Sequence, residues 1–163
     1  MTHTETDWTT APLTELIDHI VSVHHDYLKR EMPRITGLLA AAMPHAETRE
    51  IRRVWRAFVE EMEAHLWKEE QILFPMVRAL CDGRAAAASH CGGVQNPLRV
   101  MVMEHDSADR ALQALHRITS GYRVPTDRPD LGVLYLALDQ LSQDVYTHMH
   151  KENDILFPRV LER

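Results

Sequence analysis

The chain has 163 residues, of which 45% are hydrophobic and 26% charged, and its formal net charge is −6. This composition is typical of one soluble domain with a substantial core, and no apolar run approaches the roughly 20 residues that span a bilayer. The negative charge and the lack of a Lys/Arg cluster exclude nucleic acid and an anionic membrane surface as main partners. Cys81 and Cys91 form no C-x-x-C motif and no signal peptide precedes them, so we expect a cytoplasmic protein.

The first half of the chain predicts two long helices. Residues 1–12 are polar and are interpreted as an N-terminal tail, and apolar residues then follow helical spacing over residues 13–43. We expect a kink just before Pro33, because proline cannot donate a helical hydrogen bond. A second amphipathic helix is predicted from residue 46 to about residue 80, with Pro75 bending its last turns.

The second half repeats this plan. Residues 81–97 contain three glycines and one proline and are predicted to be the longest connection. Helices are expected over about 98–118 and 130–160, separated by a polar turn. Because each apolar stripe must be buried against another, we predict an all-α, up-down-up-down four-helix bundle over residues 13–163.

One motif occurs in both halves. His65–Pro75 and His148–Pro158 both contain H-x-x-x-E followed by I-L-F-P. Residues four apart lie one turn apart on the same helix face, so each histidine and its glutamate can reach one metal centre.

An H-D pair precedes each copy of this motif, at His25-Asp26 and His105-Asp106. The two halves are therefore expected to be related by a pseudo-twofold axis, with a dinuclear metal site inside the bundle. Imidazole and carboxylate ligands favour iron or manganese, with zinc as an alternative, and the lack of cysteine argues against an iron–sulfur cluster. The candidate ligands are His25, His65, Glu69, His105, His148 and Glu152.

Neighbouring histidines compete with two of these candidates. His150 and Asp154 also form an H-x-x-x-D pair, but the distance to the proline aligns His148 with His65, so His150 should point away from the site. His25 is preferred over His24 because it is followed by aspartate, as His105 is.

Three acidic residues recur near the candidate ligands. Glu61 and Asp144 stand four residues before His65 and His148, and Glu104 precedes His105. Metal-bound imidazoles usually donate their second N–H to a carboxylate, so these three are candidates for that role. The alternative is that they are ordinary solvated helix charges.

These motifs together resemble the hemerythrin-type HHE domain, and most closely the di-iron domain of the RIC (repair of iron centres) proteins. The resemblance implies two non-haem iron ions, oxo- or hydroxo-bridged, with the four histidines as terminal ligands and Glu69 and Glu152 as bridging carboxylates. Oxygen-carrying hemerythrins instead have an H-x-x-x-H motif and five histidine ligands, which this chain lacks. RIC proteins also carry an N-terminal domain with adjacent cysteines, whereas here the sequence begins just before the metal-binding motifs.

The resemblance implies a role in nitrosative and oxidative stress, in which the protein supplies iron for damaged iron–sulfur clusters and reacts with NO. Iron–sulfur proteins would then be iron acceptors, and NO and O₂ would be small ligands. A reversible O₂- or NO-binding sensor or store is an alternative. A di-iron oxidase or iron-storage protein is a second alternative, although ferritin-like sites use a Glu-x-x-His motif that is absent here. Whether the protein is an enzyme is left open.

Overall fold

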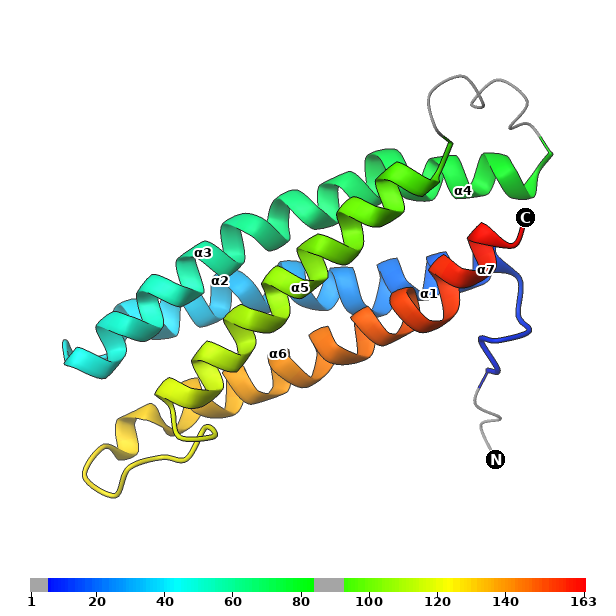
Figure 1. Cartoon of the computed structure of the whole chain (residues 1–163). Coiled ribbons are helices and arrows are strands. Elements are labelled where there is room, and N and C mark those ends of the chain that lie inside the picture. Colours follow the sequence, from blue (N-terminus) through cyan, green and yellow to red (C-terminus); the bar gives the residue numbers. More distant parts are fainter. Residues whose placement is uncertain (1–5, 84–92) are drawn as a thin grey trace, which may run out of the picture.

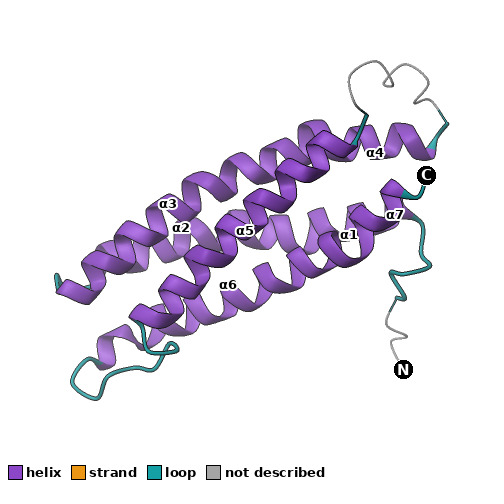
Figure 2. Ribbon diagram, in the orientation of Figure 1, coloured by secondary structure: helices purple, strands orange, loops and turns teal. Residues whose placement is uncertain are grey.

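The computed structural model describes residues 6–83 and 93–163, and every regular element within these ranges is helical (Figures 1 and 2). The elements join into four long helices that run alternately in opposite directions. The first long helix consists of α1 (Leu13–His19), the π-helical turn η1 (Ile20–His25) and α2 (Asp26–Ala41). The second consists of α3 (Ala46–Lys68), the π-helical turn η2 (Glu69–Leu73) and α4 (Phe74–Cys81).

The third long helix is α5 (Gln95–Ile118). The fourth begins with a short 3₁₀ turn, η5 (Pro129–Leu131), and continues through α6 (Gly132–His150), the π-helical turn η6 (Lys151–Leu156) and α7 (Phe157–Leu161). The helices pack as a ring in which α3 contacts α5 and α2 contacts α6, closed by α2 with α3 and α5 with α6. This arrangement confirms the predicted four-helix bundle.

The buried apolar side chains form two clusters along the bundle. The larger cluster joins α2, α3, α5 and α6 and includes Trp55, Phe58 and Tyr135. The smaller one joins α1, α4, the start of α5 and α7, and includes Phe74 and Phe157. In every long helix, a short stretch with buried polar residues separates the part that belongs to one cluster from the part that belongs to the other. A polar layer therefore divides the core.

The structure adds local detail at two prolines. Pro33, near which a kink is expected, lies inside helix α2, which continues on both sides of it. Just before Pro75, where a bend is expected, the chain forms a π-helical turn in which the N–H of Phe74 bonds to the carbonyl of Glu69, five residues earlier.

Within the described residues, no helix is both long and apolar enough to cross a membrane. Most of the predicted central connection, including Cys91, lies outside the described residues. Cys81, at the end of α4, is half-buried against the smaller apolar cluster.

Candidate metal centre

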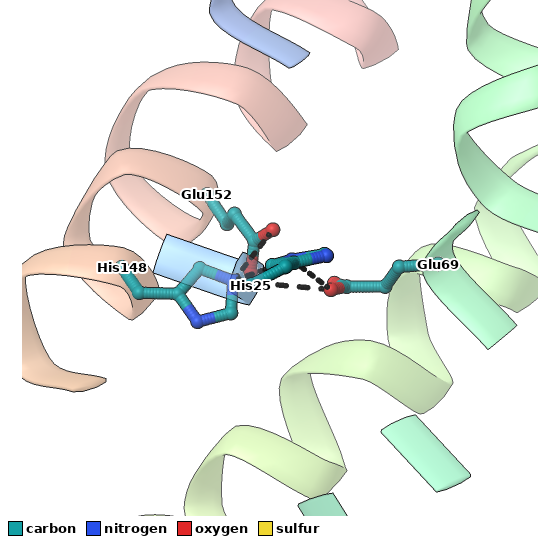
Figure 3. A group of neighbouring side chains, drawn as sticks. All are labelled: His25, Glu69, His148 and Glu152. Carbon is teal, nitrogen blue, oxygen red and sulfur yellow. Dashed lines mark hydrogen bonds and ion pairs between the residues drawn. The ribbon is translucent and has the colours of Figure 1, made fainter. Parts of the chain in front are cut away.

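The structure brings the six predicted ligand residues together in the polar layer. They divide into two overlapping groups, each with ligand atoms within 4.8 Å of one another. Position 1 comprises His25, His148 and both glutamates, and position 2 comprises His65, His105 and the same two glutamates. Figure 3 shows the side chains of position 1 converging, with His148 and Glu152 on the fourth long helix and His25 and Glu69 on the first and second. Glu69 and Glu152 belong to both groups, and each group adds two histidines of its own.

The six side chains are almost fully buried, and none is more than 3% exposed. Glu69 lies 3.3 Å from the Nε2 atom of His25 and 3.4 Å from that of His65. Glu152 lies 3.1 Å from the Nε2 atoms of both His105 and His148. All four imidazoles therefore direct Nε2 at a shared pair of carboxylates.

The surroundings of the two glutamates suit binding of a cation between them, because the two carboxylates are buried close to each other. All four of their carboxylate oxygens are buried and lack a hydrogen-bond partner among the described residues. Burial and the adjacent Glu152 raise the pKa of Glu69 well above its usual range, whereas the imidazoles of His148 and His105 outweigh burial and lower the pKa of Glu152. Two buried carboxylates at this separation remain ionised together only when cations neutralise them. The donor set of four imidazoles and two carboxylates suits iron or manganese.

The repeated I-L-F-P motif helps to position the histidines. The ring of Phe74 stacks on His25 with 5.7 Å between ring centroids, and Phe157 stacks on His105 at 5.9 Å. Each phenylalanine follows a π-helical turn that begins at or beside a glutamate of the site, at Glu69 in η2 and beside Glu152 in η6. A third π-helical turn, η1, ends at His25. Single π-helical turns within α-helices are frequent at functional sites.

Comparison with known proteins decides the family. The family model named hemerythrin HHE cation binding domain matches residues 16–160. The chain belongs to this hemerythrin family. A probable iron-sulfur cluster repair protein of Haemophilus influenzae is 33% identical to this chain over an alignment of 165 positions. The alignment covers 95% of this chain and 68% of that protein. The iron-sulfur cluster repair protein YtfE of Escherichia coli O81 is 32% identical over 163 residues, which cover 96% of this chain and 70% of YtfE.

Three imidazoles of this hemerythrin-type site hold a polar partner on their outer nitrogen. The Nδ1 atom of His25 donates to Glu70 at 2.8 Å. His65 donates in the same way to Glu104 at 2.9 Å, and His105 donates to the amide oxygen of Asn153 at 2.8 Å. With the proton on Nδ1, the Nε2 lone pair of each ring is free to bind a metal ion.

These contacts correct part of the sequence analysis. Glu104 accepts the predicted hydrogen bond from a candidate ligand, although that ligand is His65 on another helix. Glu61 instead accepts a hydrogen bond from Ser107 and is exposed, and Asp144 accepts from His24. Neither Glu61 nor Asp144 therefore bonds to one of the six candidate ligands. The prediction was wrong for these two residues because helical periodicity gives the face on which a side chain lies but not how far it reaches.

Two of these partners, Glu70 and Asn153, are not among the residues predicted from the sequence. Each immediately follows a glutamate of the site, so the repeat itself carried the signal. The remaining predictions about neighbouring residues agree with the structure. His150 is exposed and bonds to Asp154 at 2.6 Å, and the aspartates of both H-D pairs are also exposed.

The pKa values of the imidazoles are shifted in different directions within the hemerythrin-type site. Burial, followed by the nearby His148, lowers the pKa of His25 to about 4, and burial also lowers the pKa of His65. Although burial opposes it, interaction with Glu152 raises the pKa of His105. The hydrogen bond from His65 and the ion pair with Lys68 lower the pKa of Glu104 to about 2, so this carboxylate stays ionised at neutral pH.

A cavity of about 10 Å³ lies beside His65 and His105, and its wall includes Glu61 and Glu104. This is about the space that one water-sized molecule occupies. A larger surface groove between α3 and α5 shares Glu61 and Glu104 as lining residues. Position 2 therefore lies next to a small cavity, and Glu61 and Glu104 line both this cavity and the surface groove.

Proposed function

We propose that the protein is a non-haem di-iron protein of the nitrosative and oxidative stress response that supplies iron for the repair of damaged iron–sulfur clusters. The observation that carries this proposal is the buried pair Glu69 and Glu152, which two groups of histidines share and whose four carboxylate oxygens lack a hydrogen-bond partner among the described residues. The relatives named for iron-sulfur cluster repair support the choice of iron and of repair.

The residues of the site have distinct roles in this proposal. His25 and His148 would hold one iron ion and His65 and His105 the other, while the two glutamates bridge them, with an oxo or hydroxo group completing the bridge. The bound iron pair would supply redox chemistry and affinity for NO and O₂. Each position offers two imidazole nitrogens and two carboxylate oxygens, which leaves octahedral iron with room for small ligands and exchange. The surrounding apolar clusters limit the access of water.

Iron transfer tests the proposal. We expect the purified protein to bind about two iron ions per chain and to show an oxo-bridge absorption band when oxidised. After anaerobic reduction and exposure to NO or O₂, it should pass iron to an apo-ferredoxin that is supplied with sulfide, as measured by recovery of the cluster spectrum. His150→Ala is the matched control, since His150 lies on the same helix but is exposed, and it should transfer iron like the parent chain. Failure of the loaded protein to restore any cluster would overturn the repair role.

Reversible binding of O₂ or NO is a second candidate function. The small cavity beside His65 and His105 favours it, because this space lies directly next to two of the candidate ligands. The same experiment separates the two functions. Reversible uptake and release of O₂ without transfer of iron would support a sensor or store.

A further inference from the structure

The two metal positions are equivalent in the sequence repeat but not in their surroundings. The pseudo-twofold relation pairs His25 with His105 and His65 with His148, so it exchanges position 1 with position 2. Perfect symmetry would give the two positions the same hydrogen-bond partners.

Position 2 has a partner for each of its imidazoles. The Nδ1 atom of His65 donates to Glu104, and Glu104 also forms an ion pair with Lys68. His105 donates to Asn153. A carboxylate or carbonyl on the outer nitrogen fixes the orientation of a ligating imidazole and raises its basicity.

Among the described residues, position 1 has only one such partner. The Nδ1 atom of His25 donates to Glu70, and Glu70 forms an ion pair with Lys29 at 2.6 Å. The Nδ1 atom of His148 is buried and has no hydrogen-bond partner among the residues that the structure describes. His148 is the repeat equivalent of His65, so the partner that is missing corresponds to Glu104.

The sequence explains the difference. In the repeat, the residue before His105 is Glu104, and the residue before His25 is His24. Lys68 likewise corresponds to Lys151. A histidine therefore stands where symmetry would place the carboxylate that supports His148.

His24 cannot take over this role, because both of its ring nitrogens are already engaged. Its Nδ1 atom donates to Asp144 at 2.8 Å, and its Nε2 atom accepts from Lys151 at 2.8 Å. Its ring also lies nearly parallel to that of His148, at 7° with 5.7 Å between centroids. The lone pairs of an imidazole lie in the plane of its ring, so this face offers His148 no acceptor.

We propose that His24 makes the metal centre asymmetric, so that the iron at position 1 is held more weakly and leaves first. This inference rests on the proposed di-iron function and identifies which iron ion is donated. Loss of a partner of this kind typically lowers metal affinity by about 10- to 100-fold. His24 is therefore a positioning residue that sets metal lability without contacting the metal.

Iron release to a chelator tests this inference. The reduced, fully loaded protein is mixed anaerobically with excess ferrous chelator, and the coloured complex is followed with time. We expect two phases of about one iron per chain each, separated in rate by about 10-fold or more. His24→Glu should slow the fast phase by about 10-fold, since Lys151 is placed to pair with the new carboxylate as Lys68 pairs with Glu104. His24→Gln, which supplies an uncharged acceptor, should slow it less.

Glu104→Gln is the mirror variant and should accelerate the slow phase only. Mössbauer spectra give a second measurement, in which the parent chain shows two iron environments of equal area that become more alike in His24→Glu. Release of both irons at one rate by the parent chain, or an effect of both variants on the same phase, would overturn the inference. The assay contains no acceptor protein, so this outcome is distinct from a failure of cluster repair, which would leave two-phase release unchanged.

Discussion

At the scale of single residues, the site is defined by what the two nitrogens of each imidazole ring contact. The Nε2 atoms of the four histidines turn inward to Glu69 and Glu152, and three of the Nδ1 atoms are hydrogen-bonded on the outer side. This fixes the tautomer that metal binding requires. Mutations that remove a ring should therefore act directly on metal content.

We expect His65→Ala and His148→Ala each to lower the iron content from about two ions per chain to about one or fewer, because each removes an imidazole nitrogen from one position. Metal analysis of protein expressed in iron-replete medium measures the change. His150→Ala should keep the iron content of the parent chain. Equal iron in all three variants would show that the buried cluster is not the metal site.

Acid should destabilise the metal-free protein through His25. Its pKa is about 4 in the folded chain, compared with 6.5 for an ordinary histidine. As the pH falls from 6.5 to 4, the unfolded chain binds a proton that the folded chain refuses, so stability is lost across this window, by ~3 kcal/mol. Glu104 acts lower, because its depressed pKa contributes stability that is lost only as the pH falls from about 4.5 toward about 2.

Urea denaturation of the metal-free protein at pH 7 and pH 4.5 measures the effect of His25. The raised pKa of Glu69 opposes this effect, since it contributes stability that is lost as the pH rises, so the comparison with His25→Gln isolates the histidine. We expect the variant to lose less stability on acidification than the parent chain. Identical pH dependence in both would refute the role of His25.

The repeat in the sequence was sufficient to predict the six residues that converge, because each motif fixes two side chains on one helix face and the two halves constrain each other. It was not sufficient for the surroundings. Whether His24 supports His148 depends on how its ring turns between Asp144 and Lys151, which come from another long helix. Spacing along one helix contains no information about such contacts.

At the scale of elements, the helices were predicted well but their π-helical turns were not. In η2 and η6 the N–H of Phe74 or Phe157 donates a hydrogen bond to the carbonyl five residues earlier, and a proline follows immediately. Proline lacks the N–H for the usual i→i−4 bond, so it loosens the helix at the place where the wider turn occurs. The prolines in the sequence indicated a disturbance but not its geometry, and Pro33 shows that the same residue type can lie within a continuous α-helix.

Arg52 stabilises the connection between α2 and α3, and its effect on stability should not depend on the metal site. The guanidinium group of Arg52 donates to the carbonyl of Leu39 at 2.6 Å and to that of Ala42 at 2.8 Å, which lack a helical donor at the end of α2. Arg52→Ala should lower the free energy of unfolding by about 1.5–3 kcal/mol, the usual contribution of charged hydrogen bonds. Iron content should be unchanged.

Chemical denaturation and metal analysis of the same samples check this prediction. Arg53→Ala is the matched control, since Arg53 is the exposed neighbour on the same helix, and its effect should be within about 0.5 kcal/mol. A similar loss of stability in both variants would contradict the capping role of Arg52.

At the scale of the whole molecule, the polar layer stands between two apolar clusters that every long helix helps to form. Residues on both sides of this layer must pack if the four imidazoles are to meet. The layer also contains two fully buried carboxylates whose oxygens have no hydrogen-bond partner among the described residues. Metal binding and bundle stability are therefore expected to be coupled.

This coupling predicts that replacing both glutamates lowers the stability of the protein when iron is present and raises it when iron is absent. In the parent chain, iron should raise the melting temperature at pH 7, because the ion neutralises Glu69 and Glu152 and binds only the folded bundle. The double variant Glu69→Met, Glu152→Met should lose this response. Its metal-free form should nevertheless be more stable than the metal-free parent chain, by about 1–4 kcal/mol, because apolar side chains of similar volume replace buried carboxyl groups that lack hydrogen-bond partners among the described residues. Calorimetry of both proteins with and without iron measures all four states. Equal melting temperatures for the loaded and metal-free parent chain would mean that the buried carboxylates do not depend on a metal ion, and a double variant less stable than the metal-free parent would show that they are satisfied within the protein.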